Sequence, residues 1–240
     1  DLTHAADHYF LYDGGGSGPS LKFGGADFVD GQFGAWAPIG AEKTATGYQV
    51  AWKDASTGLY TAWNTDNNGN YVSHVSALTS AVSGTNYALQ SLETSVHQDL
   101  NGDGQIGLVT TAVETQGSTD LTHAADHYFL YDSVGSGPSL KYGGADFVGG
   151  QFGTWAPIGA EKTASGGFEI AWKDATGGFS IWSTDNNGNY VSTVLDHVVP
   201  TNTNLEMQES FFQQDVNGDG VIGVPPTPPS GPDGGPVESP

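Results

Sequence analysis

Hydrophobic and polar residues alternate along several stretches of the chain with the period of a half-buried β-strand. In YQVAWK, the side chains of Tyr48, Val50 and Trp52 share one face, because side chains two residues apart point the same way along a strand. FEIAWK repeats this pattern later in the chain. LYTAWNTDNNGNYVSHV predicts two strands joined by a tight Asn-Gly turn. HYFLYD and SLKFGG are predicted to pair as a hairpin across GGGSGP.

A helical period occurs in two places. NYALQSLETSVHQ puts Leu89, Leu92 and Val96 on one stripe, and NLEMQESFFQQ does the same with Leu205 and Phe212. Each helix runs directly into an acidic loop. The pattern predicts a mainly β fold of the α+β class, with antiparallel strands and one short helix before each loop.

The chain is an internal repeat. DLTHAADHYFLYD occupies residues 1–13 and returns letter for letter at 120–132, and the similarity continues to the acidic loops. We therefore predict two tandem homologous domains, residues 1–110 and 111–224, with a strand expected within 108–119. Residues 225–240 are rich in Pro and Gly and are predicted to be a linker to further domains of the same polypeptide.

Charge and composition exclude several function classes. The 240 residues contain 6 basic and 27 acidic side chains, a formal net charge of −21. Such a field repels nucleic acid and attracts cations. The chain has no Cys, so any stabilising cross-link beyond the hydrophobic core must be something other than a disulfide, such as a bound metal ion. No apolar run approaches the roughly 18 residues that a membrane span needs, and the start at Asp1 is expected of a mature product or an excised fragment.

Two acidic loops, HQDLNGDGQIG and QQDVNGDGVIG, carry the clearest candidate chemistry. Oxygen ligands at alternate positions of a tight turn, with a glycine at the bend and a main-chain carbonyl at position 7, are typical of a calcium loop. The predicted ligands in these positions are Asp99, Asn101, Asp103 and the Gln105 carbonyl, then Asp215, Asn217, Asp219 and the Val221 carbonyl. We predict one Ca²⁺ ion per domain; the alternative is a polar turn that binds nothing.

The distal carboxylate of such a loop is missing from its usual place. Position 12 holds Thr110 in the first copy and Pro226 in the second, where an EF-hand would have Glu. Glu93 and Glu209 each lie six residues before the first Asp, on the incoming helix. They are predicted to complete the two calcium sites.

Two other polar motifs carry weaker signals. TDNNGN offers oxygens from Asp66, Asn68 and Asn70, and from Asp185, Asn187 and Asn189 in the second copy. These are a second candidate metal turn, although the Asn-Gly pair already accounts for them as a hairpin turn. HAADH has the spacing of a helical zinc pair, but it runs into a β-like stretch with no third ligand, so an ordinary strand edge is favoured.

The tryptophans divide into two groups. Trp52 and Trp172 lie on apolar faces and are predicted to be core. Trp63 and Trp182 alternate with Thr and Ser, so they are predicted to be exposed platforms on which sugar rings stack, and Trp36 and Trp155 are candidates for a second platform. The alternative is that these rings cover a domain junction or simply pack.

Catalysis is not expected. The chain has no Cys, no G-x-S-x-G elbow and no phosphate-binding loop. The acids present in both copies lie mostly in turn-like loops. A hydrolase with an unrecognised carboxylate pair is the remaining enzymatic alternative.

Three longer motifs resemble a known family. GQFGAWAPIGAEKTATGYQVAWK, YTAWNTDNNGNYVS and LETSVHQDLNGDGQIG are similar to the tryptophan-rich repeat domain first described at the C-terminus of Synechocystis proteins. The resemblance covers nearly all of both copies and implies a bacterial protein that is secreted or displayed at the cell surface. Members often occur in large calcium-binding exoproteins, beside adhesin-like or carbohydrate-active regions.

Together these observations predict a non-catalytic, calcium-binding extracellular module. Its expected ligand is a polysaccharide or cell-surface glycan, bound to target an appended enzyme or to mediate adhesion. The alternative is a structural spacer stiffened by calcium.

Overall fold

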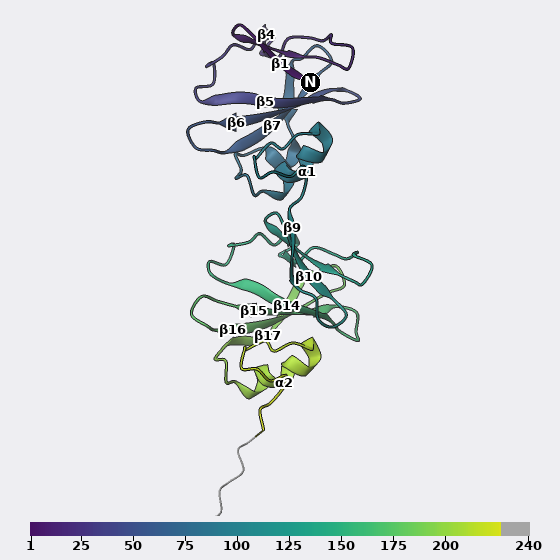
Figure 1. Ribbon diagram of the computed structural model, residues 1–240, viewed down its shortest axis with the longest axis vertical. Helices are drawn as coiled ribbons and strands as arrows, with labels where there is room; N and C mark the ends of the chain where they lie inside the picture. The colour runs from purple at the N-terminus through teal and green to yellow at the C-terminus, as the bar shows by residue number, and fades with distance from the viewer. Residues whose placement is uncertain (227–240) are drawn as a thin grey trace, which may run out of the picture. The chain divides into compact units, whose positions relative to one another are not determined.

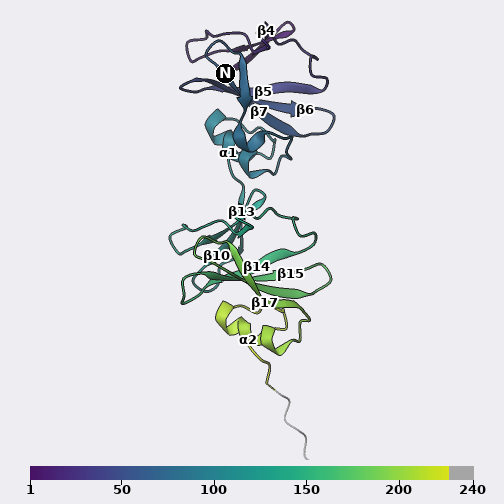
Figure 2. The same cartoon turned by 180° about the vertical axis from the view of Figure 1, so that it is seen from behind.

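The computed structural model describes residues 1–226. Most of the predicted linker, residues 225–240, therefore lies outside the described residues. The chain forms two compact units: Asp1–Thr111 together with His123–His127, and Ala112–Thr122 together with the chain from Tyr128 onward. Both are built from antiparallel β-sheet and one short helix (Figures 1 and 2), which confirms the predicted fold class.

A four-stranded antiparallel sheet forms the centre of the first unit. Its strands are β5 (Trp36–Lys43), β6 (Gly47–Asp54), β7 (Tyr60–Asp66) and β8 (Tyr71–His74), in that order. Aromatic and β-branched residues fill the middle of β6 and β7, where they favour extended backbone.

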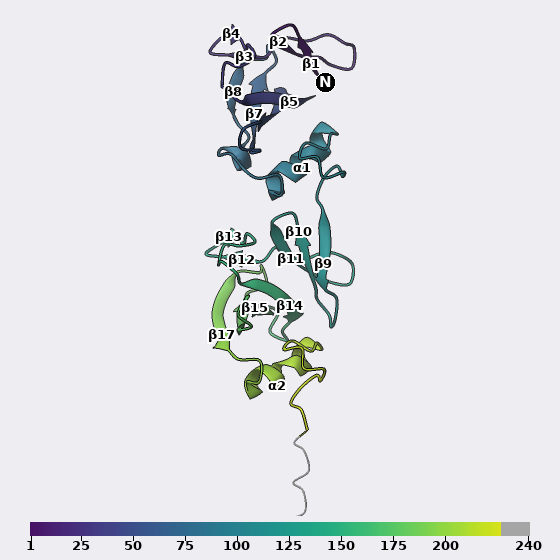
Figure 3. The ribbon, with the colours of Figure 1, turned by 60° about the vertical axis from the view of Figure 1, so that its left-hand side comes forward.

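The two faces of this sheet carry separate hydrophobic cores. One core gathers the aromatic rings of the sheet beneath the hairpins β1–β2 (Leu2–Ala5 and His8–Leu11) and β3–β4 (Lys22–Phe23 and Ala26–Asp27). The other lies between the sheet and α1 (Tyr87–Val96), with the 3₁₀ helix η1 (Ser76–Leu78) beside it. Figure 3 shows the sheet lying between the hairpins and the helix. Both faces are therefore covered.

Helix α1 forms where its sequence pattern predicted. Leu89, Leu92 and Val96 are all buried. The Asn86 side chain accepts hydrogen bonds from the N–H groups of the second and third helical residues, and His97 ends the helix in the left-handed conformation at φ 54°.

The second unit repeats this architecture. Its central sheet has the order β14-β15-β16-β17, with α2 below it. The remaining strands are two hairpins, one of which gains β9 as a third strand within the stretch where a strand was expected. The bounds are β9 (Thr110–Glu114), β10 (Asp120–Ala124), β11 (His127–Tyr131), β12 (Lys141–Tyr142), β13 (Ala145–Asp146), β14 (Ala156–Lys162), β15 (Phe168–Lys173), β16 (Phe179–Thr184), β17 (Tyr190–Val198) and α2 (Thr203–Phe212).

One strand pairing differs from the prediction. HYFLYD pairs over four residues with Leu2–Ala5. Its predicted pairing with SLKFGG is short, limited to an antiparallel bridge between Phe10 and Ser20 with a hydrogen bond from the Leu21 N–H to the Tyr9 carbonyl. The reason is the turn at Ala6, which takes φ 56° and reverses the chain within THAADH. Among residues 1–226, no helix is long and apolar enough to cross a bilayer.

Candidate functional site

A pocket of about 330 Å³ opens beside the central sheet of the first unit. Its floor is a group of aromatic rings, with the centroids of Trp52 and Trp63 4.3 Å apart and Phe33 packed edge-on to Trp63. Trp36 lines the same pocket from the start of β5. The other lining residues are Phe23, Thr61, His74, Thr79 and Ala81.

The second unit has an equivalent pocket of about 390 Å³. Trp172 and Trp182 lie 4.4 Å apart in its floor, and Phe152 packs edge-on to Trp182. The remaining lining residues are Tyr142, Trp155, Ser180, Tyr190, Thr193, Asp196 and His197. The chain thus builds one aromatic arrangement twice, at a size within the usual range for small-molecule sites.

The prediction that Trp63 is an exposed platform is wrong. Only 6% of Trp63 is exposed, and Trp182 is partly buried against the corresponding core. The Thr and Ser residues beside them do not mark a solvent face, because hairpins and loops cover that face of each sheet. Trp52 and Trp172, predicted to be core, are each 1% exposed.

The better-exposed rings stand at the rim of each pocket. Trp36 and Trp155 are both partly exposed, and Phe23 and Tyr142 are 38% and 41% exposed. The sequence analysis missed this last pair, because their two-residue strands carry no hydrophobic period.

Polar groups differ between the two pockets. In the first, Thr61 donates to the Leu78 carbonyl at 2.8 Å, and its Oγ1 lies 3.1 Å from His74 Nδ1. The second has Asp196 and His197 at its edge, and the His197 ring stands edge-on to Trp155 at 5.5 Å. Among the described residues, no Asp or Glu lines the first pocket, and Asp196 is the one carboxylate that lines the second.

In the first acidic loop, the carboxylates hold the backbone in a tight turn. Asp99 accepts from the N–H groups of Gly102 at 2.7 Å and Gly104 at 2.9 Å, one with each carboxylate oxygen. Asn101 accepts from the Asp103 N–H at 2.9 Å, and Asp103 accepts from the Gln105 N–H at 2.9 Å. The predicted ligand residues are therefore brought into one loop and joined by hydrogen bonds.

Glu93 is fully buried at the base of this loop. Its Oε1 accepts from the N–H groups of Leu100 and Asn101, at 3.0 and 3.2 Å, and its Oε2 accepts from Gly107 at 3.0 Å. A single carboxylate thus ties both ends of the loop to helix α1. Its predicted role as a calcium ligand stays a prediction beside this hydrogen-bonded role.

The second loop has the same bonds. Glu209 accepts from the N–H groups of Val216, Asn217 and Gly223, each at 3.0 Å. The remaining loop bonds run from Gly218 and Gly220 to Asp215, from Asp219 to Asn217, and from Val221 to Asp219.

The donor set suits calcium in its chemistry. Carboxylate and amide oxygens are the ligands that Ca²⁺ prefers. Asp99 Oδ2 and Asp103 Oδ1 each accept a single N–H and keep a lone pair, whereas Asp99 Oδ1 accepts two N–H groups. Within residues 1–226, no three His, Cys, Asp or Glu side chains are gathered to hold a metal ion. The calcium assignment stays a prediction.

The TDNNGN turns are docked against the neighbouring hairpins. Asp66 accepts from the N–H groups of Asn68 and Asn70, and the bond from Asn70 is the main cause that lowers its pKa. Lys22 donates to the Asn68 carbonyl at 2.9 Å. Gly69 has φ 81°, and a Cβ there would lie 2.1 Å from the Ser20 carbonyl oxygen, so only glycine fits.

Asp185, Asn187 and Asn189 repeat this turn, with Lys141 in the place of Lys22. The hydrogen bonds within each turn account for the presence of Asp66 and Asp185 there. Their role as a second metal turn stays a prediction.

The HAADH histidines pair with carboxylates. His4 Nε2 lies 2.7 Å from Asp30, and His8 Nδ1 lies 2.6 Å from Asp7. The two histidines stand on adjacent strands of a hairpin, not on one face of a helix. This agrees with the prediction that HAADH is an ordinary strand edge and not a helical zinc pair.

Comparison with family models identifies both copies. The model of the tryptophan-rich Synechocystis species C-terminal domain matches residues 2–107 and 119–223. The chain belongs to this family, as a tandem pair. Comparison with curated proteins and with solved structures gave no significant match.

Proposed function

We propose that these two tryptophan-rich domains form a non-catalytic binding module that holds sugar rings of a polysaccharide in their aromatic pockets. The observation that carries the proposal is the repetition of the pocket. Trp36, Trp52 and Trp63 line the first, and Trp155, Trp172 and Trp182 line the second. The second copy has different residues at the pocket edge but the same aromatic floor, as expected if the rings have a use beyond packing.

Sugar rings suit such a pocket physically. The C–H groups of a pyranose face pack against a flat indole, and hydroxyl groups at the ring edge need polar partners. Thr61 and His74 offer these in the first pocket, and Ser180, Thr193 and Asp196 in the second. The net charge of −21 disfavours anionic polymers, so the proposed ligand is neutral or weakly charged.

The pocket linings favour binding over hydrolysis. Glycosidases of the common classes use two carboxyl groups on either side of the scissile bond. In the part of the chain that the structure describes, no carboxylate lines the first pocket and one lines the second. The proposed role of each pocket is therefore to bind a glycan, not to cleave it.

The acidic loops are proposed to bind one Ca²⁺ ion each. Asp99, Asn101 and Asp103, with the Gln105 carbonyl, would supply oxygen ligands in the first loop, and their equivalents would do so in the second. Bound calcium would neutralise part of the acidic charge and stabilise the folded state. In keeping with the family resemblance, we place the module in an extracellular or surface protein of a bacterium, where it targets an appended enzyme or mediates adhesion.

A structural spacer is the second candidate. The observation that favours it is the burial of Trp63, which is only 6% exposed and joins the aromatic core. In that case the tryptophans serve packing alone and the pockets have no ligand.

Replacement of the rim tryptophans separates these two functions. The double variant Trp36→Ala/Trp155→Ala removes partly exposed rings and leaves the buried floor intact. We expect it to lose retardation in affinity gels that contain neutral polysaccharides, with its far-UV circular dichroism unchanged. Each single variant should keep partial retardation, because one pocket remains. A matched control is Tyr12→Ala, which removes a ring outside the pocket. Retardation that survives in the double variant, or that is absent from the native chain across the polysaccharides tried, would favour the spacer.

Calorimetry tests the calcium sites on their own. We expect the chelated chain to take up one ion per domain, and Asp103→Ala to remove one of the two. Asp13→Ala, in a turn outside both loops, should leave calcium uptake unchanged. An absence of heat in the native chain would contradict the calcium assignment.

A further inference from the structure

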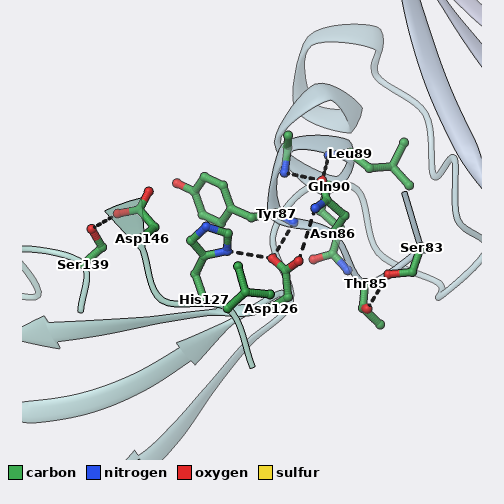
Figure 4. Close-up of polar contacts among 12 residues, drawn as sticks. Ser83, Thr85, Asn86, Tyr87, Leu89, Gln90, Asp126, His127, Ser139 and Asp146 are labelled. Atoms are coloured by element: carbon green, nitrogen blue, oxygen red, sulfur yellow. Dashed lines mark hydrogen bonds and ion pairs between the residues drawn. The ribbon is translucent and has the colours of Figure 1, made fainter. Parts of the chain in front are cut away.

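The first compact unit includes a short turn that caps helix α1. This unit contains His123–His127 as well as Asp1–Thr111. Asp126 accepts from the Tyr87 N–H at 2.8 Å and from Asn86 Nδ2 at 3.2 Å (Figure 4). His127 Nδ1 lies 2.6 Å from the same carboxylate, and the His127 ring packs on Tyr87 with centroids 4.8 Å apart. An Asp–His pair thus occupies the start of a helix.

The same turn occurs in the first copy without a helix against it. Residues 1–13 and 120–132 are identical, and Ala6 and Ala125 have the same left-handed backbone, at φ 56° and 55°. His8 Nδ1 lies 2.6 Å from Asp7, the distance found in the other pair. The Asp7 side chain is 61% exposed and that of Asp126 is 16% exposed.

Helix α2 begins as α1 does. Asn202 caps it by accepting from the Asn204 and Leu205 N–H groups, as Asn86 accepts from Ala88 and Leu89. Thr203 stands in the place of Tyr87 and is exposed. Within residues 1–226, neither the Thr203 N–H nor Asn202 Nδ2 has an acceptor. These are the two donors that Asp126 satisfies on α1.

We propose that the exposed Asp7–His8 turn of one chain binds the start of helix α2 of a second copy of this chain, head to tail. The Asp7–His8 turn has the same backbone geometry and the same sequence as the Asp126–His127 turn that caps α1. A carboxylate at a helix N-terminus is favoured by the free N–H groups and by the helix dipole. Because Asp126 occupies α1, α2 is the other helix of residues 1–226 that can make this contact, and such a head-to-tail contact lets further copies add as a ring or an open filament.

Two features keep the contact weak in the native chain. Thr203 lacks the ring that Tyr87 places against histidine. The net charge of −21 repels a second copy until salt screens it. Thr203→Tyr should therefore strengthen the association by about two- to tenfold, the contribution of one aromatic pair.

Sedimentation equilibrium of the full chain over a range of concentrations at 0.5 M NaCl, roughly a 4 Å Debye length, tests the proposal. We expect the native chain and Thr203→Tyr to associate reversibly, the variant more tightly. Adding Asp7→Ala to Thr203→Tyr should abolish the association, while Asp13→Ala, with the same charge change in a neighbouring turn, should not. Each variant is first checked for native circular dichroism.

Two results would overturn the proposal. One is a Thr203→Tyr chain that remains monomeric at the highest concentration reached. The other is an association that persists at full strength in Asp7→Ala, since another surface would then be responsible. Both results leave glycan retardation untouched, so the proposed function stands or falls separately.

Discussion

The two domains have the same acidic loops nearly bond for bond, yet they close their tryptophan pockets with different residues. In the first, η1 is followed by Thr79 and Ala81 at the pocket edge. In the second, β17 continues to Val198 and brings Asp196 and His197 there. Loops at a surface tolerate insertion and exchange, whereas a buried carboxylate with three N–H partners does not. The acidic loops are thus held by their buried carboxylates, whereas one edge of the pocket differs between the copies and the rim tryptophans Trp36 and Trp155 are present in both.

A second difference lies at the hairpin above the pocket. Tyr9 donates to Asp30 at 2.5 Å in the first domain, while Gly149 stands at the equivalent place in the second. The same thirteen-residue segment therefore faces different neighbours in its two copies. Identical sequence sets identical backbone here, but the partners decide what each side chain does.

The largest expected effect distinguishes the two pocket floors. Trp63→Ala should destabilise the first domain by about 4 kcal/mol, as a large ring is lost from a packed core. Trp182→Ala should cost less, because Trp182 is partly exposed. Urea denaturation followed by tryptophan fluorescence measures both. Equal losses would show that the difference in burial has no energetic consequence.

Loss of the loop carboxylates should affect both domains alike. Glu93→Ala and Glu209→Ala each leave three backbone N–H groups without a buried acceptor. We expect each to lower the unfolding free energy of its own domain by about 3 kcal/mol. The measurement is urea denaturation in the presence of chelator, which keeps calcium out of the comparison. If either variant keeps the native free energy of unfolding, other acceptors have replaced the carboxylate.

The two Asp–His turns should respond differently to the same change. Asp126→Ala removes a helix cap and should cost about 1 kcal/mol, whereas Asp7→Ala should leave the dilute chain nearly unchanged. Burial acts to raise the pKa of Asp126, but hydrogen bonds from His127 and the Tyr87 N–H outweigh it and hold the pKa below its usual value. The folded state therefore favours the ionised form, and the Asp126 contribution is lost as pH falls through this lowered pKa. The pKa of Asp7 is lowered as well, chiefly by its hydrogen bond with His8, so the two variants are compared by thermal melts at neutral pH; equal losses of melting temperature would contradict the difference.

The smallest expected effect concerns Tyr9. Burial, together with the hydrogen bond to Asp30, raises the pKa of Tyr9 to about 12. The neutral phenol is favoured by folding, so this contribution is present below about pH 10, the ordinary tyrosine value, and is lost as pH rises toward 12. Asp30→Gly, which copies the second domain, should lower that pKa. Titration of tyrosinate absorbance at 295 nm tests this, and an unchanged curve would show that burial alone sets the pKa.

The sequence by itself determined the duplicated architecture, the family and most of the elements. A period of two in YQVAWK and a period of 3.6 in NYALQSLETSVHQ were sufficient, because each element buries one continuous stripe. The acidic loops were also visible, since their ligand-like residues are neighbours along the chain.

Only the tertiary structure decided what the aromatic side chains do. Trp63 alternates with threonines, a pattern that predicts a solvent face, but hairpins distant in sequence cover that face and bury the ring. The sequence predicts Glu93 as a metal ligand, and the fold adds that its carboxylate accepts three N–H groups. Asp7 is exposed and Asp126 is partly buried although their thirteen-residue segments are identical in sequence. Burial and partnership depend on what packs against a segment from elsewhere in the fold, and a local pattern carries no information about that.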